Sequence, residues 1–383
     1  MSVLRSAARA VPALLALALV LAACGEPVDG SIEEPAEEPS PDEPVGQDDE
    51  PDPEPDGEAG DADEADEAAA DEPAAVTVAA TVSPIADLVR QVGGQRVEVS
   101  PMVPAGADAH TYEPRPQDVV TLTEADLYLG VGLELNDGVL RLAEENLPEA
   151  TPLVRLGEQA LSDDELVFDH GHSHDHDHIH DDDHSHDDDH SHDHGDDGDG
   201  LGPNPHVWTS VRNTVALIDG IETALSEVDP DGSDAYAESA ERYREQLEEL
   251  DARIAEAAAT IPDDARTLVT YHDAWTYFAR DYDLQFETAV QPEDFSDPSA
   301  SEVRDVIDLV RELDVPAVFG SEEFPTPVLE RIAEETGARY VEDLADDVLP
   351  GQVGDPEHTY IELMTRNAVS IVEALGGDAA PLR

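Results

Sequence analysis

The 383-residue chain is long enough for two domains of ordinary size, and it carries 92 acidic residues against 19 basic ones, a formal net charge of −73. All 19 basic residues are arginines. This balance argues against nucleic acid as a partner, because binding to phosphates needs a basic face, whereas an acidic surface favours solubility and attracts cations.

The first part of the chain has the form of an export signal over residues 1–23. Two arginines precede an apolar run at residues 10–21, which is too short to span a bilayer comfortably as a helix. Small residues then lead to Cys24, the only cysteine of the chain, so no intrachain disulfide can form. The segment resembles a bacterial lipoprotein signal, whose cysteine is acylated; a plain signal peptide with a chance cysteine is the alternative. We therefore expect a lipid anchor on the extracytoplasmic face of the cell membrane.

The next segment, residues 24–73, is rich in proline, aspartate and glutamate and contains almost no large apolar side chains. Such a composition cannot bury enough apolar surface to offset the entropy lost on ordering. We expect a disordered, extended tether between the membrane and the folded part.

An N-terminal α/β lobe is predicted for residues 74–232. Strands are expected at 75–81, 96–101, 126–131 and 153–155, and helices at 83–93, 116–125, 134–146 and 211–227. Ser83 and Pro84 fit an N-cap and a first-turn proline. Strands that alternate with helices indicate a mostly parallel sheet.

One long helix is predicted within residues 233–261, where apolar side chains recur every three or four positions among charged ones. These apolar positions are Tyr236, Ala240, Tyr243, Leu247, Leu250 and Ile254. About 27 helical residues form a rod of roughly 40 Å, which is long enough to connect two lobes.

A second α/β lobe is predicted for residues 262–383. Strands are expected at 267–271, 315–319 and 338–341, and helices from Asp273, at 299–313, at 326–336 and from Pro356. The predicted fold class is therefore α/β, with two lobes that each contain a mostly parallel sheet flanked by helices, joined by one long rigid helix.

Eleven of the 15 histidines lie between residues 170 and 194, within a low-complexity loop at 169–200. They are His170, His172, His174, His176, His178, His180, His184, His186, His190, His192 and His194. Neutral imidazole binds zinc, copper and nickel, and the interleaved aspartates raise the local cation concentration. We expect a disordered accessory metal loop; inert acidic low complexity is the alternative.

Three of the other histidines stand at the ends of predicted strands or loops. His110 lies in GADAHTYEP, His206 in NPHVW, and His272 in YHDAW directly after a strand. Each one alone would be typical of a structural histidine. However, ligands gather outside the carboxyl ends of parallel strands, so the three together are candidate metal ligands. His358 follows Asp355-Pro356 and fits a helix start instead.

These three motifs, in this order around a His-rich insert, resemble the zinc-binding class of ABC-transporter solute-binding lipoproteins. The resemblance covers about residues 74–378. It implies a zinc ion between the two lobes, bound by one imidazole nitrogen each from His110, His206 and His272. It also implies that manganese-preferring relatives tend to have a carboxylate in place of the third histidine, and that the partner is the membrane permease of an ABC transporter. We expect a monomer.

The resemblance also suggests a carboxylate as the fourth ligand. The family usually places an aspartate two residues before a leucine, just after the last strand. We match this position to Glu342 in Val341-Glu342-Asp343-Leu344. Asp343 or a water molecule could take its place, and a solvated acid on a turn is the alternative for Glu342 itself.

The expected function is that of a high-affinity extracytoplasmic zinc receptor that delivers Zn²⁺ to an ABC importer, and not that of an enzyme. The sequence does not separate zinc from other divalent transition metals. One alternative is an extracellular His-rich metal buffer or chaperone, in which the tract does the work. A zinc hydrolase is a further alternative, but the chain lacks an H-E-x-x-H motif, and a closed four-ligand site would leave no place for substrate.

Overall fold

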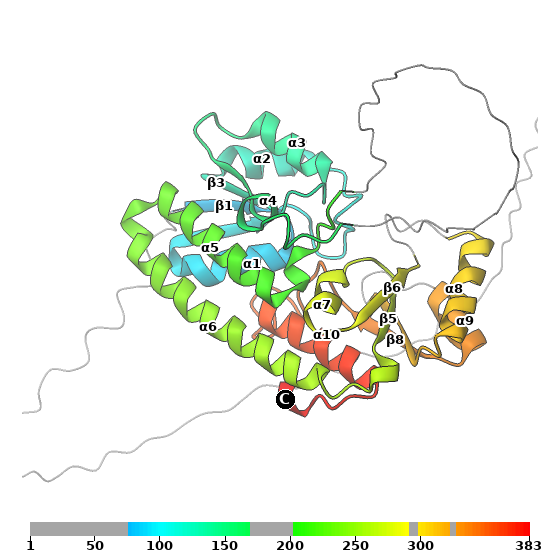
Figure 1. The fold of residues 1–383 in the computed structure, drawn as a ribbon. Coiled ribbons are helices and arrows are strands. Elements are labelled where there is room, and N and C mark those ends of the chain that lie inside the picture. The colour runs from blue at the N-terminus through cyan, green and yellow to red at the C-terminus, as the bar shows by residue number, and fades with distance from the viewer. Residues whose placement is uncertain (1–75, 169–201, 291–297, 322–326) are drawn as a thin grey trace, which may run out of the picture. The chain divides into compact units, whose positions relative to one another are not determined.

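The structure is a computed structural model that describes residues 76–168, 202–290, 298–321 and 327–383 (Figure 1). The predicted export signal, Cys24, the tether and the histidines of the tract lie outside these ranges. Within the described part of the chain, no helix is both long and apolar enough to cross a membrane.

The first sheet is parallel and has the strand order β2-β1-β3-β4. Its strands are β1 (Val76–Ala80), β2 (Val97–Pro101), β3 (Leu127–Gly130) and β4 (Leu153–Arg155). The two central strands, VTVAA and LYLG, are almost wholly buried, as expected for parallel strands covered on both faces. The helices that follow the strands are α1 (Ser83–Gly93), α2 (Pro116–Glu124), α3 (Asp137–Asn146) and α4 (Leu156–Ala160).

The second sheet is also parallel and repeats this arrangement in the order β6-β5-β7-β8. Its strands are β5 (Thr267–Thr270), β6 (Gln285–Ala289), β7 (Ala317–Ser321) and β8 (Arg339–Leu344). Its helices are α7 (Thr276–Asp281), α8 (Ala300–Glu312), α9 (Pro327–Thr336) and α10 (Tyr360–Ala374). The edge strand β6 was not predicted, because its short sequence QFETA mixes polar and apolar residues without a clear pattern.

Two long helices lie between these sheets in the sequence, α5 (Val211–Val228) and α6 (Ser233–Ala258). All six apolar positions predicted for the long helix are buried. Along its 26 residues, α6 packs against α5 and α1 of the first lobe and against α10 of the second, as Figure 1 shows. The predicted fold class, two α/β lobes joined by a long helix, is confirmed.

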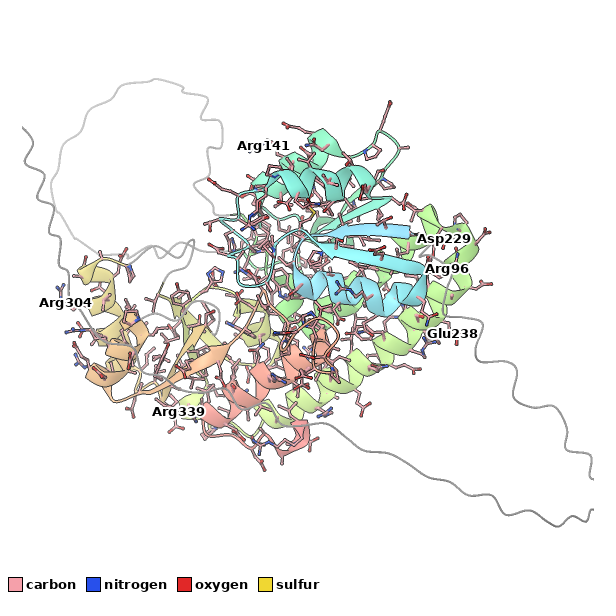
Figure 2. All side chains as sticks on the ribbon, turned by 180° about the vertical axis from the view of Figure 1, so that it is seen from behind. Arg96, Arg141, Asp229, Glu238, Arg304 and Arg339 are labelled. Atoms are coloured by element: carbon pink, nitrogen blue, oxygen red, sulfur yellow. The ribbon has the colours of Figure 1, made fainter. Side chains whose placement is uncertain are left out.

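Short 3-10 turns connect several of these elements, namely η1 (Gly94–Arg96), η2 (Val207–Thr209), η3 (Pro230–Gly232), η4 (Asp263–Ala265) and η5 (Ala380–Leu382). An ion pair fixes the start of α6 on the first lobe (Figure 2). The guanidinium of Arg96 lies 2.7 Å from the carboxylate of Asp229, which also accepts a hydrogen bond from the hydroxyl of Tyr236 at 2.6 Å.

Several helix starts differ from the prediction, since α3 begins at Asp137 rather than at 134 and α7 begins at Thr276 rather than at Asp273. Val82, not Ser83, is the N-cap of α1, and Ser83 is the first helical residue. The last helix begins at Tyr360 rather than near Pro356, with Thr359 as the N-cap whose side chain accepts from the Glu362 amide. The segment before it is a series of turns in which Gly351 and Gly354 have φ angles of 70° and 97°, and this backbone cannot continue a right-handed helix.

Candidate metal centre

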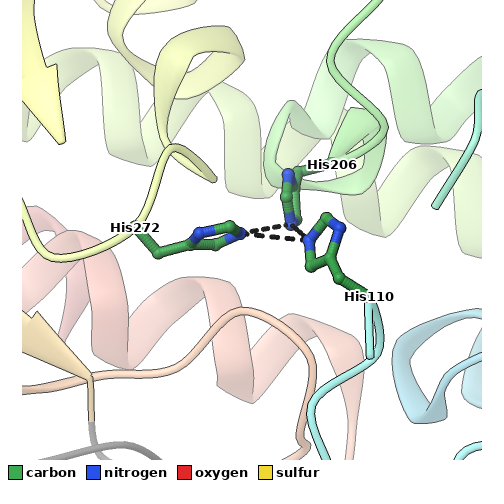
Figure 3. A group of neighbouring side chains, drawn as sticks. All are labelled: His110, His206 and His272. Carbon is green, nitrogen blue, oxygen red and sulfur yellow. Dashed lines mark hydrogen bonds between the residues drawn. The ribbon is translucent and has the colours of Figure 1, made fainter. Parts of the chain in front are cut away.

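The three predicted histidines come together although they are far apart in the sequence. The Nε2 atom of His110 lies 3.1 Å from that of His206 and 3.2 Å from that of His272, and the last two are 3.0 Å apart. Figure 3 shows the three imidazoles pointing toward a common point. Zn–N bonds of 2.0–2.1 Å at tetrahedral angles place two ligand nitrogens about 3.3 Å apart, so the trio has nearly the spacing of zinc ligands.

The loop between β2 and α2 holds His110. The carboxylate of Asp108 accepts a hydrogen bond from the His110 backbone amide at 2.8 Å. The Asn136 side chain donates to the carbonyls of Ala109 and Tyr112 on either side of this histidine. Asn136 is also the N-cap of α3, so the loop is tied to the start of that helix.

His206 stands just before the short turn η2, and Asn204 orients its ring. The Asn204 Oδ1 atom accepts from both the backbone amide and the Nδ1–H of His206, each at 3.0 Å. Its amide nitrogen donates to the carbonyl of Asp273 at 2.6 Å. Because Nδ1 carries the proton, the lone pair is on Nε2, the atom that faces the other two histidines.

His272 lies two residues after the end of β5 and is 5% exposed. The hydroxyl of Thr270, the last residue of the strand, donates to the His272 carbonyl at 2.7 Å. The hydroxyl of Thr209 donates to the carbonyl of Ala274 at 2.8 Å and so joins the His272 segment to the His206 segment. His272 therefore comes from the second lobe but is linked to the first.

Two buried aspartates, Asp346 and Asp347, lie at the edge of the cluster. The ligand atoms of His206, Asp346 and Asp347 are all within 4.8 Å of one another. Oδ2 of Asp346 lies 3.9 Å from Nε2 of His206. The cluster thus has carboxylate oxygens beside its imidazole nitrogens.

The structure places the carboxylates expected from the sequence elsewhere. Glu342 and Asp343 are exposed on β8, and the Asp343 carboxylate accepts a hydrogen bond from the Ser370 hydroxyl at 3.0 Å. Strand β8 continues through Leu344, so the chain leaves the sheet, and reaches the histidines, only afterwards. The candidate carboxylate ligands are therefore Asp346 and Asp347, and not residues 342–343.

A signal in the sequence could have identified this position. Asp347-Val348-Leu349 also has an aspartate two residues before a leucine, the same spacing that led to Glu342. The earlier match assumed that the last strand ended near residue 341. His358, which was expected to be structural, lies outside the cluster, and its Nδ1–H donates to the carbonyl of Pro350 at 3.2 Å.

Burial sets the protonation of the cluster. Burial, assisted by the neighbouring His272, lowers the pKa of His110 to about 4, and burial beside two other histidines lowers the pKa of His206 well below its usual value. Burial raises the pKa of Asp346 to about 6, although the nearby His110 opposes the shift. At neutral pH the imidazoles of His110 and His206 are therefore neutral, as metal ligands must be, and they place no positive charge beside the buried Asp346 carboxylate.

Comparisons with known proteins identify relatives over most of the chain. Residues 78–374 match the family model for the zinc-uptake complex component A, a periplasmic protein. The manganese-binding lipoprotein MntA of Halalkalibacterium halodurans is 27% identical over 298 residues, which cover 78% of this chain and 88% of the relative. The iron-binding protein YfeA of Yersinia pestis is 29% identical over 301 residues, covering 78% of this chain and 86% of the relative.

The fold is also that of a solved structure. The periplasmic zinc-binding protein TroA from Treponema pallidum matches with a TM-score of 0.65 at 24% identity, over 78% of this chain and 99% of that one. The family match begins in the first strand, β1, and ends with the last residue of α10. The protein therefore belongs to the ZnuA family of periplasmic zinc-uptake components.

Proposed function

We propose that this protein is a high-affinity extracytoplasmic zinc receptor that delivers Zn²⁺ to an ABC importer. The observation that carries the proposal is the histidine cluster, in which three Nε2 atoms lie within 3.2 Å of one another. Members of the family are the solute-binding components of metal ABC transporters and not enzymes. The permease of such a transporter would be the partner.

The choice of zinc rests on the donor set. The relatives are named for manganese, iron and zinc, so membership of the family leaves the metal open. Imidazole nitrogen suits zinc, whereas manganese prefers oxygen ligands. Three imidazoles with one carboxylate form a tetrahedral set that is typical of Zn²⁺.

We infer that the fourth ligand comes from the pair Asp346 and Asp347. Both carboxylates are buried, and the raised pKa of Asp346 reflects the cost of ionising it without a cation nearby. A bound Zn²⁺ would supply that positive charge, and binding would drive off the carboxyl proton. Because the ligands belong to four separate segments of the chain, displacement of one segment would open the site for release.

We also propose an accessory role for the tract at residues 170–194, which would collect ions for the centre. The described residues flanking it support this role, because Phe168 and Pro203 pair as a short antiparallel bridge. Asn204, the next residue, binds His206. The described residues on both sides of the tract therefore lie near the centre. A lipid on Cys24 would hold the protein, as a monomer, at the membrane surface.

The test is a zinc titration, by competition with a chromophoric chelator, of a chain in which the eleven tract histidines are replaced by asparagine. One ion should still bind tightly. A structural zinc site contributes about 10–16 kcal/mol, so one of four ligands accounts for about 3 kcal/mol, and His272→Ala should weaken binding at least about 100-fold. His358→Ala is the matched control and should bind like its parent.

Loss of all tight binding in the tract variant would instead make the protein a His-rich metal buffer, which is the second candidate because eleven histidines lie in the tract. Delivery is tested separately, by uptake of radioactive zinc into cells that lack this protein. The wild-type chain should restore uptake and His272→Ala should not.

A further inference from the structure

One face of α1 makes side-chain hydrogen bonds to a segment of the second lobe. Ser83, Asp87 and Gln91 recur at a spacing of four residues and so share this face. The side chains of Ser83 and Asp87 are both buried and both bind the segment between Asp347 and Tyr360. This segment follows the last strand of the second lobe, whereas α1 belongs to the first.

Ser83 holds the backbone next to the candidate carboxylate ligands. Its Oγ donates to the carbonyl of Asp347 at 2.9 Å and accepts from the amide of Leu349 at 3.2 Å. A serine at the start of a helix ordinarily caps its own first turn. In α1 the N-cap is Val82 and no side chain caps the helix, so the Ser83 hydroxyl is directed to the other lobe.

The carboxylate loop has two further polar attachments. The indole N–H of Trp208 donates to the carbonyl of Asp346 at 2.8 Å. The side chain of Asn367, on α10, bonds to both the amide and the carbonyl of Ala345, at 3.0 and 2.7 Å. Asn367 therefore fixes the residue before the two aspartates, and Ser83 fixes Asp347 and the residues that follow it.

Asp87 holds the far end of the same segment. Its carboxylate accepts a hydrogen bond from the amide of Tyr360, the first residue of α10, at 2.8 Å, and one from the Gln91 side chain at 3.1 Å. A negative charge at the N-terminus of a helix is favourable. The polar face of α1 thus holds both ends of the segment that leads from the aspartates to α10.

We propose that Ser83 is a positioning residue of the metal centre, which orients the Asp346–Asp347 carboxylates from the opposite lobe. The inference rests on the proposed function, because it requires those carboxylates to bind the ion. Residues that orient metal ligands typically change metal affinity by about 10–100-fold when they are replaced. Ser83→Ala removes two hydrogen bonds to the ligand loop and leaves all three histidines untouched.

The experiment uses the full chain with the tract histidines replaced by asparagine. Ser83→Ala should bind zinc about 10–100-fold more weakly than this parent, and the visible spectrum of its Co²⁺ complex should change as carboxylate coordination is altered. Ser299→Ala is the matched control, because Ser299 also accepts a backbone N–H at a helix start but within α8 itself. The control should keep the parent's affinity and spectrum.

The decisive comparison is made in a chain that also carries Asp346→Asn and Asp347→Asn. If Ser83 acts through the carboxylates, Ser83→Ala should have no further effect there. Parent-like binding by Ser83→Ala, or equal weakening with and without the aspartates, would overturn the inference while His272→Ala still tests the receptor function. A parent that binds no tight ion would overturn both. Should Ser83→Ala fail to fold, Ser83→Cys, a weaker hydrogen-bonding group of similar size, takes its place.

Discussion

The histidines and the aspartates of the candidate metal centre are held in place by different means. Each histidine is anchored by the polar side chain two residues before it. Asp108, Asn204 and Thr270 each bond to the backbone of the histidine that follows. The aspartates depend on distant residues instead, since Trp208 and Ser83 lie 138 and 264 positions away from the residues they hold.

This difference separates ligands whose backbones are anchored within their own loops from ligands whose backbones are anchored by the other lobe. The histidines keep their backbone anchors as long as their own loops are intact. The aspartates keep theirs only while α1 and Trp208 contact the loop after β8. We therefore expect the aspartates to be the ligands that respond most to any movement between the lobes.

Removing both carboxylates should have the largest effect on zinc affinity. Asp346→Asn with Asp347→Asn leaves three imidazoles, so zinc binding should weaken about 100-fold or more, by the loss of about 3 kcal/mol for one ligand. Manganese binding should suffer more, because oxygen ligands matter more to that ion. Competition titrations with both metals on the tract-free chain measure this, and the single variants assign the ligand.

Zinc affinity that stayed at the parental level in the double variant would show that the aspartates do not bind the ion. The neighbouring pair Glu342→Gln with Asp343→Asn is the control. Both residues are exposed on β8, so this variant should bind zinc like its parent.

Loosening one histidine from its local anchor should have the next largest effect. Asn204→Ala removes the acceptor that keeps the proton on Nδ1 of His206, and zinc affinity should fall about 10–100-fold. Asn146→Ala is the control, because that side chain also bonds a backbone carbonyl but within α3. Zinc titrations of both variants in parallel measure this effect. Equal affinities would show that Asn204 does not orient a metal ligand.

The contrast between local and distant anchors also explains which parts of the site could be predicted from the sequence. The histidines were found from short motifs, because the residues that place them are adjacent in the chain. Glu342 was chosen because the end of β8 was placed too early, and a strand boundary cannot be read from RYVEDLADD alone. The role of Ser83 was misread as an N-cap, since nothing local shows that its hydroxyl faces a loop 264 residues away.

The pH dependence of zinc binding should also distinguish the histidines from the aspartates. A ligand must lose its proton to bind, so a histidine of pKa 6.5 would cost about 30-fold in affinity between neutral pH and pH 5. With its pKa lowered to about 4, His110 stays largely neutral at pH 5. Asp346, with its pKa raised to about 6, is mostly protonated there and should cost about tenfold.

Titrations at pH 7, 6 and 5, with a chelator calibrated at each pH, measure this dependence. In Asp346→Asn the tenfold loss assigned to this group should disappear. A fall in affinity of several thousand-fold in the parent would show that the histidines titrate near their ordinary pKa, and that burial does not protect them from protonation.

The smallest effect concerns the stability of the metal-free protein. A carboxyl whose pKa is higher in the folded state than in the unfolded state destabilises the fold where it is ionised. For Asp346 this loss grows as the pH rises from about 4 to about 6 and is complete at pH 7. Asp346→Asn should therefore raise the free energy of unfolding at pH 7 by about 1–3 kcal/mol and have little effect at pH 4.

Thermal unfolding of the metal-free and zinc-saturated proteins measures this difference. Asp343 is exposed and provides the control. Asp343→Asn should change the free energy of unfolding by no more than about 0.5 kcal/mol. With saturating zinc the order should reverse, because the wild type binds the ion more tightly and gains more from it. A metal-free Asp346→Asn less stable than the wild type at pH 7 would contradict the prediction. The expected result would mean that the loop held by Ser83 and Trp208 keeps a carboxylate where it costs stability until the ion arrives.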